Sequence, residues 1–376
     1  MNRLLGLELL RGLAALAILL EHVRYSVRDA CGVGVAVPWL ISRVECYWGV
    51  DLFFVLSGYV IGLTLDKPGT TARSFLLARL ARVLPLYLVA TTFCLAFQTC
   101  YLGEPSVSTL VTTYTLMPLA GDALNPSTAH PYGWTLCYEA LFYLAATALA
   151  AAAGGRRAVP ALVALFALAP LAFTAAGPVP GWDYPSFALS PLTAEFALGL
   201  LAYRLTGRLP GWAGGALLAL SVLGLARGCL AEGNYGPQAE VIADPMWAWG
   251  RVARFGLPAF CCVLGVARLD HAGVFRPVAR LATASGAVSY SLYLVQPLAF
   301  ITTAVVAKSL GVTGPWAVAA LTVALTLAQA VAVFHYLDRP LHALAKGWAK
   351  RLSTPRQPSS ASSALTFASI RSRTAR

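Results

Sequence analysis

The amino-acid sequence predicts an all-α protein, a polytopic transmembrane bundle of about ten helices, and its composition and apolar runs carry this prediction. Of its 376 residues, 58% are hydrophobic and 12% are charged, which is about half the charged fraction of a typical soluble domain. Apolar runs of about 20 residues recur along the chain, the length that crosses a hydrocarbon core of about 30 Å. We expect helices rather than barrel strands, because the runs are uniformly apolar and do not alternate.

Ten membrane spans are expected from these runs. The span at 250–266 is the least regular, because Arg251 and Arg254 crowd its start. A signal peptide is the alternative interpretation of the first run, but ionisable residues interrupt its apolar region and no A-x-A cleavage site follows promptly. The predicted spans lie near residues 7–27, 46–65, 84–102, 132–153, 158–176, 187–205, 212–231, 250–266, 284–304 and 315–336.

The distribution of lysine and arginine predicts the orientation of the bundle. With the N-terminus in the cytoplasm, 20 of the 28 basic residues fall on the cytoplasmic side, seven fall on the opposite side and Arg11 lies within a span. An even number of spans then places both termini in the cytoplasm, and we expect the inner (plasma) membrane of a bacterium. This topology also explains the net charge of +12. Nucleic-acid binding is disfavoured, because the charges are divided among short loops.

We predict one integral-membrane domain over residues 1–340 and a basic, Ser-rich, disordered cytoplasmic tail over residues 341–376, which rests on membrane lipid. The eight cysteines show neither a C-x-x-C pair nor the spacing of a zinc site, so no metal site is expected. A disulfide between Cys31 and Cys46 in the first outward loop is left open by the sequence.

The first span carries the most informative polar residues of the chain. It contains Glu8, Arg11 and His22, although an ionisable group deep in a bilayer costs roughly 2.5–3.5 kcal/mol on insertion scales. On a helix, His22 comes to within about 20° of the azimuth of Arg11 and about 16–17 Å further along the axis. Ala15 and Ile18 complete a stripe between them. Such a stripe is typical of an internal pathway.

Polar groups and glycines mark the ends of the next two spans. Asp51 opens the second span and is either a hydrated interfacial group or a functional one. Gly58 and Gly62 in that span favour close packing of helices. Arg79 and Arg82 share one helical face before the third span, where positive-inside anchoring accounts for them. The sharper interpretation is a phosphate site, because paired guanidiniums bind phosphate oxygens bidentately.

The fourth and ninth spans add aromatic residues and a carboxylate. Trp134 and Tyr138 are typical of an interfacial aromatic belt. Glu139 lies about one and a half turns inside the span, where a carboxylate is costly, and it is suited to orient or protonate an imidazole. Tyr290 and Tyr293 belong to a polar run in the ninth span. Hydroxyls between helices often serve packing alone, which is the favoured interpretation of this run.

Taken together, these segments resemble the acyltransferase-3 family of bacterial integral-membrane O-acyltransferases. The motifs follow the family order from residue 7 to residue 341, and Arg-x10-His in the first helix and FFVLSG in the second are the most diagnostic. Gln296 stands where family members often have His, and Glu8 stands where Asp is common. The matching segments are LELLRGLAAL…H, WGVDLFFVLSGYVIG, RLARVLPLY, GWTLCYEALFYL, SYSLYLVQPL and LDRPL.

The resemblance implies an acyltransferase for groups other than aminoacyl groups. Such an enzyme takes an acyl group, commonly acetyl, from cytoplasmic acyl-CoA to a hydroxyl of a cell-surface or exported polysaccharide or a lipid-linked saccharide, with no bound cofactor. It also implies His22 as the catalytic residue, with Arg11 and Glu139 as catalytic partners. The candidate substrate-binding residues are Arg79, Arg82, Asp51, Ser57, Trp134, Tyr138, Tyr290 and Tyr293.

His22 suits the chemistry of this transfer. An imidazole titrates at about pH 6.5, so it can remove the proton of the acceptor hydroxyl or carry the acyl group itself. Glu139 is the candidate carboxylate beside it. CoA is expected to keep its phosphates at the cytoplasmic arginines while His22 lies in the outer half of its helix. Either the pantetheine arm or the acyl group alone must then reach across much of the membrane. An acyl-histidine intermediate and direct transfer both fit the sequence.

Two classes of function are alternatives to the enzyme: a transporter and a regulator. A transporter of a polar or anionic solute would also need intramembrane Glu, Arg and His residues, but it would neither label a glycan nor release CoA from acetyl-CoA. A regulator that kept the fold without the chemistry is disfavoured, because Arg11, His22 and Glu139 are all present.

Overall fold

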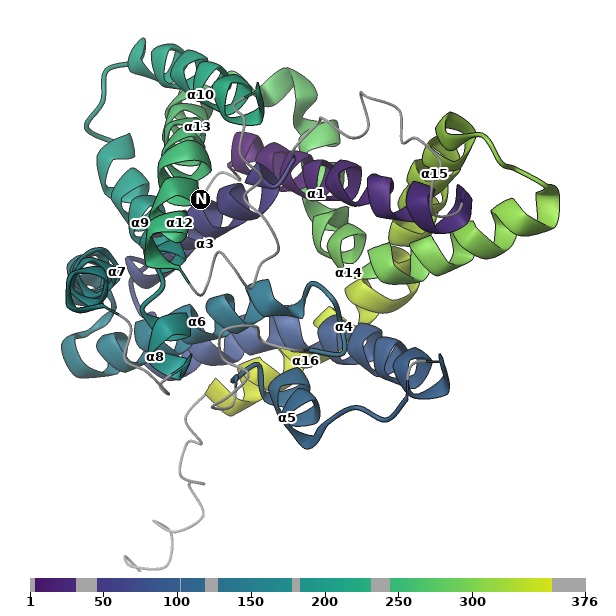
Figure 1. The fold of residues 1–376 in the computed structure, drawn as a ribbon. Helices are drawn as coiled ribbons and strands as arrows, with labels where there is room; N and C mark the ends of the chain where they lie inside the picture. Colours follow the sequence, from purple (N-terminus) through teal and green to yellow (C-terminus); the bar gives the residue numbers. More distant parts are fainter. Residues whose placement is uncertain are drawn as a thin grey trace, which may run out of the picture.

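The computed structural model describes residues 4–31, 46–101, 103–118, 128–177, 183–230 and 244–353. Within these ranges the chain is helical and contains no strand, which confirms the all-α fold (Figure 1). Nine helical segments in the described ranges are long and apolar enough to cross a membrane. Helix α1 (Leu5–Cys31) is a further long helix, but its charged residues exclude it from that set. The protein is therefore a multi-pass membrane protein.

Each of the ten predicted spans falls on one of these helical segments. Four of the segments combine several elements: the end of α8 with η1 and α9, then α12, η2 and α13, then η3 and α14, and finally α15, η4 and α16. The elements after α1 are α3 (Trp48–Leu65), α4 (Ala72–Tyr101), α5 (Val107–Thr115), α6 (Gly133–Ala153), α7 (Gly155–Ala176), α8 (Asp183–Ala188), the 3₁₀-helix η1 (Pro191–Thr193), α9 (Ala194–Thr206), α10 (Ala213–Leu230), α12 (Pro245–Arg251), the π-helix η2 (Val252–Gly256), α13 (Leu257–His271), the 3₁₀-helix η3 (Arg276–Val278), α14 (Ala279–Leu310), α15 (Pro315–Val333), the π-helix η4 (Phe334–Asp338) and α16 (Arg339–Ser353).

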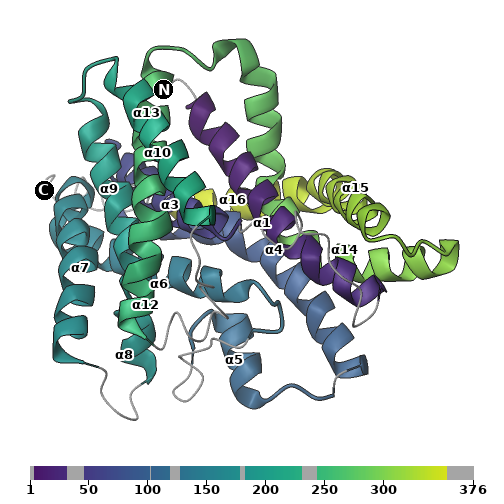
Figure 2. The same ribbon diagram turned by 45° about the horizontal axis from the view of Figure 1, so that its top comes forward.

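The bundle is organised around α1 and α3. Helix α1 packs along α14 and α3 and meets α15 near its C-terminal end (Figure 1). Helix α3 packs against α9, and α9, α10, α12 and α13 lie on the same side of the molecule in both views (Figure 2). Helix α4 packs against α6, α14 and α16. The polar faces of α1, α3, α4, α6 and α14 are thereby directed at one another.

Glycines bring α3 and α9 into close contact. A Cβ atom built on Gly58 would lie 2.3 Å from the carbonyl oxygen of Phe196, and one built on Gly199 would lie 2.0 Å from that of Val55. Both positions lack room for any side chain, because real Cβ atoms do not approach an oxygen so closely. The packing role expected of Gly58 is confirmed, and it sets the distance between two helices beside the site.

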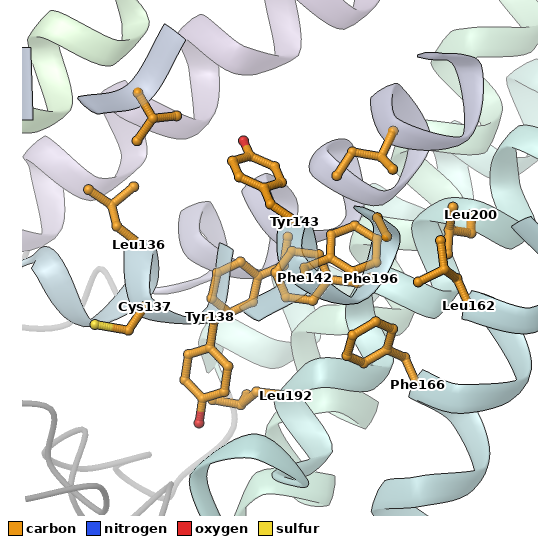
Figure 3. Packing of buried hydrophobic residues seen from close by; sticks show 14 of the residues in the cluster. Leu136, Cys137, Tyr138, Phe142, Tyr143, Leu162, Phe166, Leu192, Phe196 and Leu200 are labelled. Carbon is orange, nitrogen blue, oxygen red and sulfur yellow. The ribbon is translucent and has the colours of Figure 1, made fainter. Parts of the chain in front are cut away.

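An aromatic cluster anchors α6 to its neighbours. Phe142, Phe166 and Phe196 stack on one another, with ring centroids 4.4–6.3 Å apart. Tyr143 lies at the edge of this cluster, and its hydroxyl points away from the phenylalanines (Figure 3). Because aromatic contacts of this kind restrict rotation, the cluster holds α6 so that its polar face is presented to one side.

The C-terminal segment differs from expectation, and the disulfide that the sequence left open is not formed. Residues 341–353 form most of α16, which packs on α4, instead of the disordered tail predicted from residue 341. Residues 354–376 of that predicted tail lie outside the described residues. Cys31 and Cys46 are not linked: the Cys31 thiol contacts the carbonyl oxygen of Thr313 at 3.4 Å, and Cys46 is a buried thiol. Burial raises the pKa of the Cys46 thiol to about 12.

Candidate active site

A cavity of about 290 Å³ lies between α1, α3, α4, α6 and α14. Its wall contains Ile18, Phe53, Leu136 and other apolar side chains, together with polar groups from every one of these helices. Seven of the eleven candidate site residues line it: Arg11, Ser57, Arg79, Arg82, Glu139, Tyr290 and Tyr293. The structure therefore brings together residues that lie up to 282 positions apart in the sequence.

Arg79 and Arg82 enter the cavity from α4, three residues apart on one face. Nη2 of Arg79 donates to the Thr64 hydroxyl at 2.5 Å. The Arg82 guanidinium lies 5.0 Å from the centre of the Tyr290 ring, within range of a cation–π contact. Both side chains are partly exposed to the cavity, so part of each guanidinium is open to a ligand.

Asp338 holds Arg82 from behind. Nη1 of Arg82 donates to both carboxylate oxygens of Asp338, at 2.9 and 3.2 Å, and the Ser291 hydroxyl donates to the same carboxylate at 3.2 Å. Asp338 is 2% exposed and ends the π-helix η4. The candidate residues did not include Asp338, although it belongs to the LDRPL segment. The feature of the sequence that could have identified Asp338 is a lone aspartate at the end of an apolar span.

Glu139 lines the cavity from α6 and contacts two hydroxyls. Oε1 of Glu139 accepts hydrogen bonds from the Ser57 hydroxyl at 2.9 Å and from the Tyr143 hydroxyl. Arg11 lies within electrostatic range of the same carboxylate. Tyr143 was missing from the candidate residues, although it follows Glu139 by four positions and so shares its helix face.

The charges of the cavity wall favour an anion. Three guanidiniums line it against one carboxylate, and the carboxylate of Asp338 offsets Arg82 from behind. Glu8 lies 3.9 Å from Arg11 outside the lining, so the positive surplus belongs to the groups that line the cavity and not to the whole cluster. A cavity with apolar walls and several arginines suits an amphipathic molecule that carries phosphate groups.

His22 lies on the same helix as Arg11 but does not line the cavity. Its Nδ1 is 2.8 Å from Oε1 of Gln296, which is fully buried. With Oε1 as acceptor, Nδ1 carries the ring proton and Nε2 keeps its lone pair. The side chain that orients His22 is therefore Gln296 on α14. Glu139, which we expected in this place, bonds Ser57 and Tyr143 instead.

Tyr132 covers one face of the His22 ring. The two rings are nearly parallel, with an interplanar angle of 8° and a centroid distance of 4.2 Å. The backbone N–H of Tyr132 donates to Nδ1 of His130, and Nε2 of His130 donates to the carbonyl oxygen of Leu294. Burial lowers the pKa of His130 to about 4, so this second imidazole is neutral at physiological pH. These contacts fix the imidazole plane of His22, and no sequence pattern indicated them.

The predicted stripe on α1 is only partly open to the cavity. Arg11 and Ile18 line it, and Ile18 lies one turn before His22. Ala15 is fully buried and packs with apolar residues of α14 and α15. The cavity thus reaches from Arg11 toward His22 along Ile18, but the four residues do not form one continuous lining.

Three candidate residues have other surroundings. Asp51 forms a buried ion pair with Arg251, whose Nη2 lies 2.9 Å from Oδ2. Trp134 and Tyr138 pack against Phe54, with ring centroids 6.5 and 5.8 Å from it. None of the three lines the cavity. Their contacts are those of residues that hold α3, α6 and α12 together.

Fold and site define a class: a polytopic helical membrane protein with an internal, arginine-lined cavity and a partly buried, oriented histidine beside it. The profile of the acyltransferase-3 family, described as an acyltransferase domain, matches residues 4–335. The chain therefore belongs to this family, and the resemblance stated from its motifs is confirmed. No solved structure is significantly similar to the chain.

Two curated relatives come from rhizobia. The exopolysaccharide production protein ExoZ of Rhizobium meliloti (strain 1021) is 33% identical over 100 residues, which are 25% of this chain and 31% of ExoZ. Protein 2 in picA locus of Rhizobium radiobacter is 35% identical over 112 residues, 28% of this chain and 52% of that protein. In each case the similarity covers about half or less of the relative's length.

Proposed function

We propose that this protein is a membrane-bound O-acyltransferase that moves an acyl group, most simply acetyl, from acyl-CoA to a hydroxyl of a cell-surface or exported glycan. The observation that carries the proposal is the cavity that presents Arg11, Arg79 and Arg82 on one side and extends along Ile18 toward His22. The name of the relative ExoZ, an exopolysaccharide production protein, supports a saccharide acceptor.

The arginines are assigned to the donor. At about 290 Å³ the cavity is at the lower limit of ordinary small-molecule sites, so it suits the pantetheine arm and acyl group better than a whole CoA molecule. Arg79 and Arg82 would bind phosphate oxygens of CoA at its mouth, where bidentate guanidinium contacts are strong. Asp338 holds one side of the Arg82 guanidinium through two hydrogen bonds.

His22 is assigned to the transfer step. Nε2 removes the proton of the acceptor hydroxyl while the hydroxyl oxygen attacks the thioester carbonyl; the C–O bond forms, the C–S bond breaks, and CoA leaves as a thiolate that takes up the proton. In the alternative route Nε2 itself attacks the thioester and an acyl-histidine transfers the group in a second step. Gln296 and Tyr132 hold the ring for either route.

The proposal includes an orientation. Both termini lie in the cytoplasm of a bacterium, the arginine side of the cavity faces cytoplasmic acyl-CoA, and His22 lies nearer the outer face of the inner membrane. The excess of basic residues in loops on the side of the N-terminus supports this orientation. The acyl group, rather than CoA, would then cross the membrane.

The direct test supplies radiolabelled acetyl-CoA to inside-out membrane vesicles from cells that express the protein. We expect CoA release and label on the surface glycan, both lost in vesicles that carry His22→Ala at equal protein level. A transporter of a polar or anionic solute would produce neither signal, so vesicles that take up a solute without releasing CoA would refute the enzyme. Mass spectrometry of glycans from a deletion strain then identifies acyl group and acceptor together.

A further inference from the structure

We propose that a second cavity, at the membrane face where α1 begins, binds the phosphate headgroup of an anionic glycerophospholipid. This cavity, called here the basic hollow, has a volume of about 990 Å³ and shares no lining residue with the candidate active site. Its polar lining includes Arg156, Arg204, Arg208, Arg276, Asp66 and Asp270. The proposal is independent of the acyl-transfer function.

The basic hollow lies at the depth of lipid headgroups. Its lining residues come from helix ends: Leu5 begins α1, Arg156 is the second residue of α7, and Thr206 and His271 end α9 and α13. Asp66 directly follows α3. Because these helices cross the membrane, their ends mark its boundary with water, where phosphate headgroups are found.

Three guanidiniums of the basic hollow have no carboxylate partner. Arg204, Arg208 and Arg276 form no salt bridge with any described residue. They come from the end of α9, the turn after it and η3, and positive-inside topology explains their number on this face but not their meeting in one cavity. Arginines that converge in this way suit a phosphate, whose oxygens accept bidentate hydrogen bonds.

The two carboxylates in the lining are already engaged. Asp66 accepts a hydrogen bond of 2.6 Å from the Tyr203 hydroxyl and pairs with Arg156 at 3.4 Å. Asp270 accepts the backbone N–H of Gly6 at 2.7 Å, in the first turn of α1. Four guanidiniums against these two carboxylates leave two positive charges in the lining when all six groups are ionised.

Apolar surface beside the arginines favours a lipid over a free anion. Val274, Val278 and Leu281 flank Arg276 in the sequence, and they are 52%, 39% and 61% exposed. Inorganic phosphate or a nucleotide gains nothing from exposed aliphatic side chains. A molecule with an anionic head and acyl chains matches both features, and basic pockets between membrane helices are known to hold such headgroups.

The test compares two double variants with equal loss of charge. Arg204→Gln/Arg276→Gln removes two guanidiniums of the basic hollow, and the control Arg157→Gln/Arg280→Gln removes two exposed arginines near the same face that do not line it. Detergent-purified protein is titrated with phosphatidylglycerol or phosphatidylcholine and analysed by native mass spectrometry. We expect the first variant, but not the control, to bind phosphatidylglycerol about tenfold more weakly.

Competition distinguishes the sources of phosphate. Inorganic phosphate and CoA, each added at millimolar concentration, are expected to leave the bound phosphatidylglycerol in place. Displacement by either would identify a free-phosphate or nucleotide site and overturn the lipid assignment. Equal weakening of phosphatidylglycerol binding in both double variants would show that overall charge, and not the basic hollow, determines binding. That result would overturn the proposal. Equal binding of phosphatidylcholine would show that the arginines do not select the headgroup, and the proposal would be wrong.

Discussion

Two arginine–carboxylate pairs in this bundle have the same chemistry but different surroundings. Arg251 donates to both oxygens of Asp51, at 3.0 and 2.9 Å, and neither side chain is more than 5% exposed. Arg82 donates to Asp338 at 2.9 Å, but 27% of the Arg82 side chain remains exposed, and it lines the cavity. Each pair adjoins a π-helix, η2 or η4.

The difference indicates what each pair does. The pair of Arg251 and Asp51 is buried beside a third buried ionisable group, Glu195 of α9. These contacts hold α3 against α9 and α12 and leave no exposed surface for a ligand. Arg82 gives one side of its guanidinium to Asp338 and keeps another for a ligand. Since π-helical turns occur often at functional sites, the two pairs show that this local geometry alone does not mark the site.

The largest effect, a loss of stability, is expected from breaking the buried pair of Arg251 and Asp51. Asp51→Ala leaves a buried guanidinium without its carboxylate, which costs about 3–5 kcal/mol. Folded protein should fall sharply, measured as the temperature at which the detergent-solubilised protein loses its monodisperse elution peak. An Asp51→Ala protein that is as stable as wild type yet inactive would show that Asp51 acts on a substrate.

Breaking the pair of Arg82 and Asp338 should change donor binding more than it changes folding. Arg82→Gln removes charge-assisted hydrogen bonds worth about 1.5–3 kcal/mol each, so the apparent KM for acyl-CoA should rise about ten- to hundredfold while kcat changes less. The double variant Arg82→Gln/Asp338→Asn also removes the unpaired carboxylate and should recover stability without recovering KM. If it recovers both, Arg82 is only a structural partner of Asp338.

Replacing Arg79 or Arg82 by lysine sharpens the same comparison. Lysine keeps the charge but not the bidentate fork, so insertion should be normal and donor affinity only partly restored. Insertion is measured by protease accessibility of the loops and affinity by the KM for acyl-CoA. Lysine and glutamine variants that fail equally, and only in insertion, would reduce both arginines to topological anchors.

A smaller effect is expected at the residue that orients His22. Gln296→Leu removes the acceptor for Nδ1–H and should lower kcat about tenfold at unchanged KM, because one neutral hydrogen bond is worth about 1 kcal/mol. Gln296→Glu keeps an acceptor of the same shape and should retain more activity than the leucine variant. Equal activity of wild type and Gln296→Leu would show that the ring needs no partner on α14.

The smallest signal concerns the wall between Arg11 and His22. In a background without the eight native cysteines, a cysteine at Ile18 should react with small thiol reagents and be protected by acyl-CoA, because Ile18 lines the cavity. A cysteine at Leu20, which is 44% exposed on the outside of the bundle, should show no protection. If acyl-CoA protects the cysteine at neither position, the cavity is not the path of the donor.

The fold was predictable from hydropathy, since length and composition of each run report directly on a membrane span. Helix α1 was also identified as a span, because its run is apolar apart from a few ionisable residues. Of the seven candidate residues that line the cavity, Arg11 and Glu139 were identified because an ionisable group inside a span is costly unless it faces a polar interior. Arg79 and Arg82 were identified from their shared helix face and Ser57 from the family resemblance, whereas packing was the favoured interpretation of Tyr290 and Tyr293.

The partners of these residues were not predictable. Gln296 lies 274 positions from His22, and Asp338 lies 256 positions from Arg82. Periodicity describes which residues share a helix face, but it contains no information on which faces of distant helices meet. For the same reason the sequence did not indicate that Asp51 pairs with Arg251, which lies 200 positions away.

The central claim is that the His22 imidazole performs the acyl transfer. The most direct measurement is CoA release and glycan labelling from radiolabelled acetyl-CoA in vesicles that carry His22→Ala or wild-type protein at equal, correctly folded levels. The account predicts that the variant inserts and folds normally and that both signals fall to background. Near wild-type turnover in a well-folded His22→Ala protein would contradict it.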